Sequence, residues 1–110
     1  MHIPAADERR KNLIGGEWCE PSTGNYEPCV NPADTRESVG LFPKSGAADA
    51  KAAVDAAAAA FPAWSQTPGP ERGRVLLRAH AILKSKLDLL AEALCREEGK
   101  TFAESKGEVM

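Results

Sequence analysis

Strands give way to helices at the stretch GAADAKAAVDAAAAAFPAW, residues 46–64, because the period of the apolar residues changes there from 2 to 3.6. Apolar residues recur at the spacing i, i+3, i+4, i+7, i+8 and i+11, which is one continuous helix face; they are Ala50, Ala53, Val54, Ala57, Ala58 and Phe61. Asp49 falls in the first turn, where a carboxylate suits the positive end of the helix dipole. We expect Pro62 to end the regular helix near Phe61, because proline has no N–H to donate.

The residues before this helix form short strands and turns. Gly15-Gly16 separates two short apolar runs at residues 12–14 and 17–19, which predicts a tight β-hairpin because both turn positions tolerate φ > 0. Residues 26–30 and 39–42 are expected to be further strands, with a turn at residues 31–34. Residues 1–11 are polar and charged, and we expect them to be a mobile leader.

The residues after residue 64 predict three more helices. The first follows a linker at residues 67–70, with Pro70 suited to the first helical position. Ser85 with Asp88 resembles an N-cap and its partner, so we expect a short break and a new helix there. That helix carries one apolar face and an outer i, i+4 pair; the face is Leu87, Leu90, Ala91, Leu94 and Cys95, and the pair is Glu92 with Arg96.

The last predicted helix is short. Gly99 is a natural left-handed stop for the preceding helix, and Thr101 with Glu104 forms a capping box that opens the next one. This helix reaches Met110 without a C-cap, which we interpret as a truncation. Because alanine supplies much of the apolar content and buries little area, the helix faces are expected to pack on a larger body. The isolated chain should then be poorly folded or aggregating, and a sharp cooperative thermal transition would contradict this.

Composition excludes several function classes. A formal net charge of −2 argues against a nucleic-acid binder, and the sequence has no apolar run long enough to cross a membrane. The first residues contain no apolar signal-peptide core. Three cysteines without C-x-x-C spacing indicate reduced thiols, so we expect a cytoplasmic protein.

None of the chemically reactive side chains is placed like a catalytic group. Cys95 lies late in a helix on its apolar face, and Cys19 and Cys29 occupy strand positions where Val would serve, so we interpret all three as structural. His80 has no second ligand at metal-binding spacing, and His2 in the leader receives no role. Gly15-Gly16 lacks the surrounding pattern of a phosphate-binding loop.

Several short motifs, in order and at matching spacing, resemble the amino-terminal part of the aldehyde dehydrogenase superfamily from about Asn12 to Met110. The motifs are Asn12-Leu13-Ile14-Gly15-Gly16-Glu17-Trp18, Val30-Asn31-Pro32-Ala33-Asp34, Val54-Asp55-Ala56-Ala57, Phe61-Pro62-Ala63-Trp64, Pro70-Glu71-Arg72, Glu98-Gly99-Lys100 and Ala103-Glu104-Ser105-Lys106-Gly107-Glu108-Val109. The resemblance implies an α/β fold: a β-hairpin and short strands, then three to four helices, as an incomplete part of the Rossmann-like cofactor-binding domain. Residues 12–110 would form this part.

The resemblance also implies an activity for a much longer parent enzyme. Such enzymes oxidise an aldehyde to a carboxylic acid with NAD or NADP, and they work as homo-oligomers, either dimers or tetramers. Their nucleophilic cysteine, glutamate base, oxyanion-hole asparagine and main cofactor motifs would all lie beyond residue 110, so this chain would supply scaffold and no catalytic or cofactor-binding residue. Residues 31–42 and 96–100 resemble those of bacterial semialdehyde-type members.

One family site would reach into this chain. Many members hold a structural Na+ or K+ through main-chain carbonyls before the Asn-Pro turn and through an acidic side chain near the Gly-Lys. The resemblance places these ligands at Cys29, Val30 and Glu97, although members often carry Asp at the last position. Carboxylates at Glu97 and Glu98 oppose the dipole at the end of a helix, and either a cation or Lys100 would relieve them.

Two other functions remain open from the residues alone. The chain could be a small non-enzymatic binding module that docks through the face of Val54, Phe61 and Trp64. A stand-alone enzyme is disfavoured, because the sequence shows no grouping of nucleophile, base or metal ligands. A reading frame that continues past Met110 into a long α/β sequence with a distant Cys and Glu would favour the oxidoreductase, whereas a stop codon would favour the module.

Overall fold

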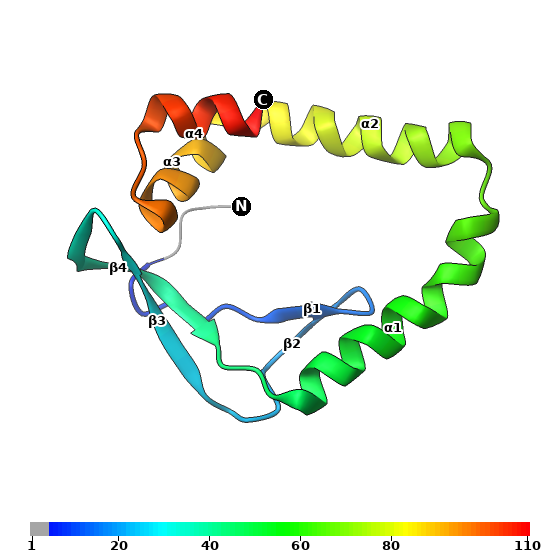
Figure 1. The fold of residues 1–110 in the computed structure, drawn as a ribbon, viewed down its shortest axis with the longest axis horizontal. Coiled ribbons are helices and arrows are strands. Elements are labelled where there is room, and N and C mark those ends of the chain that lie inside the picture. Colours follow the sequence, from blue (N-terminus) through cyan, green and yellow to red (C-terminus); the bar gives the residue numbers. More distant parts are fainter. Residues whose placement is uncertain (1–4) are drawn as a thin grey trace.

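The structure is a computed structural model that describes residues 5–110, and its strands precede its helices as the sequence predicts (Figure 1). Strands β1 (Asn12–Ile14) and β2 (Glu17–Cys19) pair antiparallel. The turn between them has φ 60° at Gly15 and 86° at Gly16, a conformation that glycine adopts without steric cost. The predicted hairpin and its turn are therefore confirmed.

Strands β3 (Tyr26–Asn31) and β4 (Asp34–Pro43) form the second antiparallel hairpin, and β4 begins five residues earlier than residues 39–42 predicted. Cys29 pairs with Gly40 and Val30 with Ser38, so Val39 has no partner in β3. Val39 is therefore the extra residue of a β-bulge, and its apolar side chain is buried, with 6% of its surface exposed.

Residues of the expected leader lie beside β4. Arg10 donates its N–H to the Leu41 carbonyl at 2.8 Å, and Leu41 donates its N–H to the Glu8 carbonyl at 3.0 Å. Arg9 forms a parallel bridge with Leu41. Residues 1–4 and His2 with them lie outside the described residues, and the mobility of the leader stays a prediction.

Helix α1 (Ala47–Gln66) continues four residues past Pro62, so the expected end near Phe61 is wrong. Proline removes a single N–H from the helix ladder, and the alanines that precede it are the strongest helix formers. The real end is closed by Thr67, whose N–H donates to the carbonyls of Ala63 and Trp64 at 3.1 and 3.2 Å.

Helix α2 (Gly69–Ser85) carries Pro70 in its first turn, and helix α3 (Leu87–Glu98) follows after a break at Lys86. The break is confirmed, but the capping role expected of Ser85 is wrong. Its hydroxyl donates backwards to the Ile82 carbonyl at 2.8 Å and so belongs to the last turn of α2. Gly99 ends α3 with φ 72°, as predicted, and helix α4 (Phe102–Val109) opens at Thr101.

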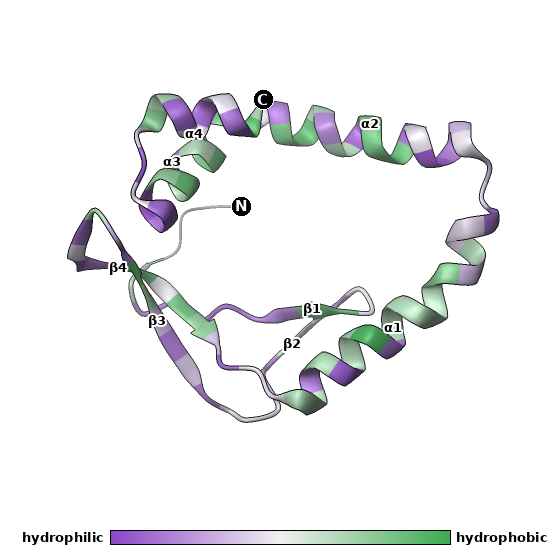
Figure 2. Ribbon diagram, viewed as in Figure 1, coloured by the Kyte–Doolittle hydropathy of each residue, from purple (hydrophilic) through white to green (hydrophobic). Residues whose placement is uncertain are grey.

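The elements form a flat, open band with extents of 47 × 35 × 18 Å. Helix α1 runs away from the hairpins, α2 runs back toward the side of the molecule that holds the β3–β4 hairpin, and α3 and α4 lie near that hairpin (Figure 1). Among residues 5–110, the buried apolar side chains are Pro21, Val39 and Ala91. Phe61 is 66% exposed and Trp64 is 42% exposed. Apolar residues alternate with polar ones along α1 and α2, and no layer of other elements in the described part of the chain covers these helices (Figure 2). The prediction of apolar faces that this chain does not cover is confirmed.

A membrane-spanning segment is not found in the part of the chain that the structure describes, because none of its helices combines the necessary length with sufficient apolar character.

Candidate functional site

The polar contacts of the chain concentrate where the β3–β4 turn (residues 31–34) meets the end of α3 (residues 95–101), and we call this region the hairpin–helix junction. The two backbones approach closely at Gly99. A Cβ at this position would lie 2.8 Å from Pro32 Cγ and 2.9 Å from the Ala33 nitrogen. Gly99 therefore combines a left-handed φ with the absence of a side chain, and both are needed for the turn to sit against the helix.

A second link at the junction is an ion pair between α3 and β4. Arg96 donates from Nε to Glu37 Oε1 at 2.6 Å, and its Nη2 lies 2.6 Å from the same oxygen. Arg96 does not form the expected i, i+4 pair with Glu92. It pairs with Glu37 instead, whose carboxylate is partly buried, whereas Glu92 is exposed. The Asn31 amide and then Arg96 hold the pKa of Glu37 below its ordinary value.

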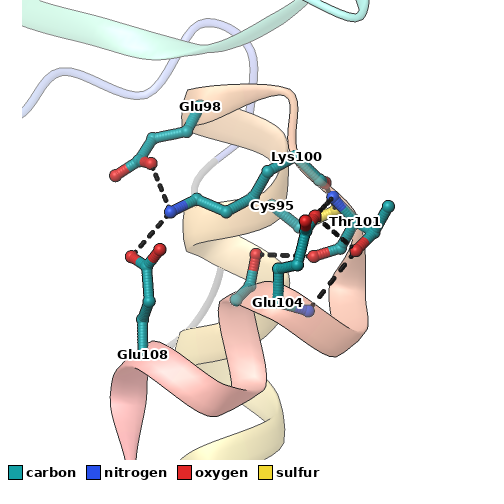
Figure 3. Close-up of polar contacts among 7 residues, drawn as sticks. Cys95, Glu98, Lys100, Thr101, Glu104 and Glu108 are labelled. Carbon is teal, nitrogen blue, oxygen red and sulfur yellow. Dashed lines mark hydrogen bonds and ion pairs between the residues drawn. The ribbon is translucent and has the colours of Figure 1, made fainter.

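Lys100 occupies the space between α3 and α4. Its Nζ lies 2.5 Å from Glu98 Oε2 and 2.6 Å from Glu108 Oε2 (Figure 3). Glu108, followed by Glu98, raises the pKa of Lys100 above its ordinary value. The charge of Lys100 therefore offsets the unfavourable interaction of Glu98 with the helix dipole. Lys100 is one of the two groups expected to do so, the other being a bound cation.

Thr101 fixes the start of α4 through the predicted capping box (Figure 3). The Thr101 hydroxyl accepts from the Glu104 N–H at 3.4 Å, and the Thr101 N–H donates to Glu104 Oε2 at 3.2 Å. The Thr101 side chain lowers the pKa of Glu104. Cys95 donates its thiol to the Lys100 carbonyl at 2.9 Å, which fits the structural role expected of it.

The three residues expected to hold a cation lie on two elements that pack together, β3 and α3. Cys29 is half-buried, whereas Val30 and Glu97 are exposed. The pairing of β3 with β4 is irregular on both sides of Val30. Among residues 5–110, no side-chain cluster of three or more His, Cys, Asp or Glu could hold a metal ion, and the Glu97 carboxylate makes no hydrogen bond or ion pair.

A second polar centre lies at the first turn of α1. The sequence predicted the position of Asp49 there but not its partner Ser22. Buried Asp49 accepts from the Gly46 N–H, the Ser22 N–H and the Ser22 hydroxyl, each at 2.8 Å. The Gly46 N–H and then the Ser22 N–H hold the pKa of Asp49 below its ordinary value. The position of Asp49 three residues after Gly46 signals the cap, but no local pattern points to Ser22.

An open groove of about 290 Å³ runs beside this centre, between β1 and the first turns of α1. Its walls are Leu13, Ile14, Ala50 and Ala53, and the bond from Asn12 Nδ2 to Ser45 Oγ at 2.8 Å lies at its rim. Apolar side chains therefore form the walls of the groove, and polar groups stand at its rim.

Comparison with known proteins identifies the family to which these strands and helices belong. The sequence profile described as "Aldehyde dehydrogenase family" matches residues 18–110. The chain belongs to the aldehyde dehydrogenase family. The resemblance found in the motifs is thereby confirmed, and the alternative of a non-enzymatic module is not favoured.

Relatives share both the sequence and the shape of this family segment. The chain is 48% identical to the alpha-ketoglutarate semialdehyde dehydrogenase of Haloferax volcanii and 44% identical to the malonate-semialdehyde dehydrogenase of Bacillus pumilus, with 90% of this chain and 20% of each relative covered. The crystal structure of an NAD-dependent aldehyde dehydrogenase from Sinorhizobium meliloti superposes with a TM-score of 0.87 at 30% identity, covering 94% of this chain and 21% of that one. The chain thus spans about a fifth of the length of these relatives.

Proposed function

We propose that the polypeptide to which this chain belongs oxidises an aldehyde to a carboxylic acid with NAD+ or NADP+, and that the substrate is a semialdehyde. The family membership of residues 18–110 supports the reaction class. The names of the two similar relatives, both semialdehyde dehydrogenases, support the substrate class. The NAD dependence of the similar crystal structure supports a nicotinamide cofactor.

Within this proposal, residues 5–110 act as scaffold. The observation that carries this role is the combination of exposed apolar faces on α1 and α2 with a shape that superposes on one fifth of a complete aldehyde dehydrogenase. Contiguous exposed apolar faces are normally covered by a partner surface. The remaining polypeptide is the covering body, and it would also supply the nucleophile, the base and the cofactor contacts.

We further propose that the carbonyls of Cys29 and Val30 and the carboxylate of Glu97 hold a Na+ or K+ ion at the hairpin–helix junction. The donor set consists of oxygen atoms, which hard cations prefer. Two further observations support the fit. The Glu97 carboxylate has no partner within residues 5–110, and the strand pairing around Val30 departs from a regular ladder. A bound cation would hold β3 and α3 together and offset the helix dipole at Glu97.

The remaining parts of the proposal concern the whole protein. We place it in the cytoplasm, because its three cysteines form no disulfide within the described chain. We expect a homo-oligomer, a dimer or a tetramer, with no nucleic-acid or membrane partner.

The test is to express the full polypeptide encoded by the reading frame and to follow the ultraviolet absorbance of the reduced nicotinamide. Malonate semialdehyde and alpha-ketoglutarate semialdehyde are the first substrates to supply, each with NAD+ and with NADP+. Reduction that depends on the aldehyde supports the proposal. A folded polypeptide that reduces neither nucleotide with any aldehyde supplied would overturn it.

A further inference from the structure

We propose that Arg96, Glu37 and Asn31 form a positioning relay that fixes the Cys29–Val30 segment relative to the end of α3 and thereby sets the affinity of the junction for a monovalent cation. This inference rests on the cation site of the proposed function. It concerns three residues that contribute no ligand themselves.

The relay begins with a contact between segments far apart in the chain. Arg96 and Glu37 are separated by 59 positions, and the guanidinium Nε lies 2.6 Å from the carboxylate oxygen Oε1. Their side chains are 24% and 35% exposed, so solvent screens this pair less than the exposed Arg36–Asp34 pair on the same strand. Arg96 directly precedes Glu97, and whatever fixes Arg96 therefore also fixes the backbone that carries Glu97.

The second step runs from Glu37 to the turn. The other carboxylate oxygen, Glu37 Oε2, accepts from the Asn31 amide at 2.7 Å, while Asn31 Oδ1 accepts from the Ala33 N–H at 2.9 Å. Both ends of the Asn31 side chain are thus engaged, and its orientation is determined. The charge on α3 is connected in this way to the backbone of the β3–β4 turn.

The third step is the need for such a restraint. Register shifts occur between Cys29 and Val30 and between Val30 and Asn31, so regular strand pairing does not fix this segment. At a bulge the ladder is locally disrupted, and other contacts must determine the backbone. The relay attaches directly at Asn31, the residue that follows the two expected carbonyl ligands.

The relay therefore resembles an outer shell that orients ligands without touching the ion. Loss of such outer partners in metal sites typically costs 10–100-fold in metal affinity. We expect a loss at the lower end, about tenfold, because the Gly99 contact at the junction also restrains the turn.

The experiment measures the thermal stability of the full polypeptide as NaCl or KCl is increased, with choline chloride at equal ionic strength as the reference. The wild type should show a midpoint concentration for stabilisation that choline does not reproduce. Arg96→Met and Glu37→Gln should raise this midpoint about tenfold and approach wild-type stability at saturating cation. Arg96→Lys should recover part of the loss, because it retains the charge.

Arg36→Met is the matched control, because it removes an exposed arginine–carboxylate pair from the same strand, and it should leave the midpoint unchanged. A fall in stability that is equal at all cation concentrations, with no shift of the midpoint, would show the pair to be structural only and would overturn the relay. A wild type that does not distinguish Na+ or K+ from choline, with Glu97→Gln behaving identically, would overturn the cation site and the relay with it.

Discussion

The hairpin–helix junction and the arm formed by α1 and α2 differ in how they are stabilised. The junction is held by contacts within this chain, whereas the arm leaves its apolar side chains exposed. At the junction, Arg96, Lys100 and Thr101 each have identified polar partners, and Gly99 lies against the β3–β4 turn. Along the arm, Phe61 and Trp64 remain exposed, and contacts with the rest of the chain are sparse. One segment of the family can therefore contain a region whose structure its own residues stabilise and another region that requires a surface from outside the segment.

Hydrogen exchange of the 110-residue chain should show the largest contrast. We expect amides of α1 and α2 to exchange within about tenfold of unstructured rates, because segments with few buried contacts open at little free-energy cost. Amides of α3 that face α4 should exchange much more slowly. Exchange can be followed by mass spectrometry of peptides from each helix, and equal protection of arm and junction would contradict the comparison.

Phe61→Ala tests whether the arm is covered in the full polypeptide. There we expect a loss of about 3–5 kcal/mol in the free energy of unfolding, since a covered aromatic side chain leaves a cavity when removed. Were Phe61 as exposed as it is in the described chain, the change would stay within about 0.5 kcal/mol. Chemical denaturation of the full polypeptide measures the loss, with Lys51→Ala as the exposed control on the same helix. A small effect of Phe61→Ala would mean that nothing covers the arm.

Gly99→Ala tests the close approach at the junction. We expect a loss of about 2 kcal/mol, because a left-handed residue with a Cβ is unfavourable and this Cβ would also collide with Pro32. Gly73→Ala in the arm is the matched control, since its added Cβ would meet nothing in the described chain within 4 Å beyond its chain neighbours and the backbone of its own helix. It should stabilise the full polypeptide by about 0.5–1 kcal/mol through helix propensity. Losses of equal size at both glycines would remove the distinction between the regions.

Thr101→Ala should cost about 1 kcal/mol, the usual value for an N-cap that loses its side-chain acceptor. Thr35→Ala, at an exposed position in β4, should change the free energy of unfolding by less than about 0.5 kcal/mol. Urea denaturation of the full polypeptide separates the two. An effect at Thr35 as large as that at Thr101 would argue that the capping box contributes nothing specific.

The smallest expected effect is the acid response at the base of the arm. The folded-state pKa of Asp49 is held below its ordinary value of 3.8, so its contribution to stability is complete above that value. The contribution is lost as the pH falls through the lowered folded-state pKa. In the full polypeptide, the protection of the first-turn amides of α1, measured as their exchange rate relative to the intrinsic rate at the same pH, should therefore fall below about pH 3.8. Asp49→Asn should lower this protection already at neutral pH. A protection that does not change with pH in the wild type would contradict this role.

Features encoded by adjacent residues could be predicted from the sequence. The Gly15-Gly16 turn, the Gly99 stop and the Thr101–Glu104 capping box depend on residues at most three positions apart, and all three were confirmed. The apolar period of residues 50–61 identified the arm and its uncovered face for the same reason. Pro62 was misjudged, because the missing N–H competes with the strong helix propensity of the alanines before it.

Contacts between distant segments could not be predicted. The Arg96–Glu37 pair joins residues 59 positions apart, and the nearer Glu92 was the only partner that helical spacing suggested. The hydrogen bonds from Ser22 to Asp49 were missed for the same reason, since they join residues 27 positions apart and leave no periodic signal in the sequence. The cation ligands Cys29, Val30 and Glu97 came from family resemblance, and they stay a prediction.

The backbone of β4 is hydrogen-bonded on both of its sides, to β3 on one side and to residues 8–10 on the other. A polypeptide that started after Arg10 would leave Leu41 with an open N–H and carbonyl at a strand edge. Open edges of this kind recruit strands from other molecules, which leads to aggregation. Residues 8–10 therefore protect the edge of β4 from pairing with strands of other molecules. We expect their removal to lower the solubility of the protein.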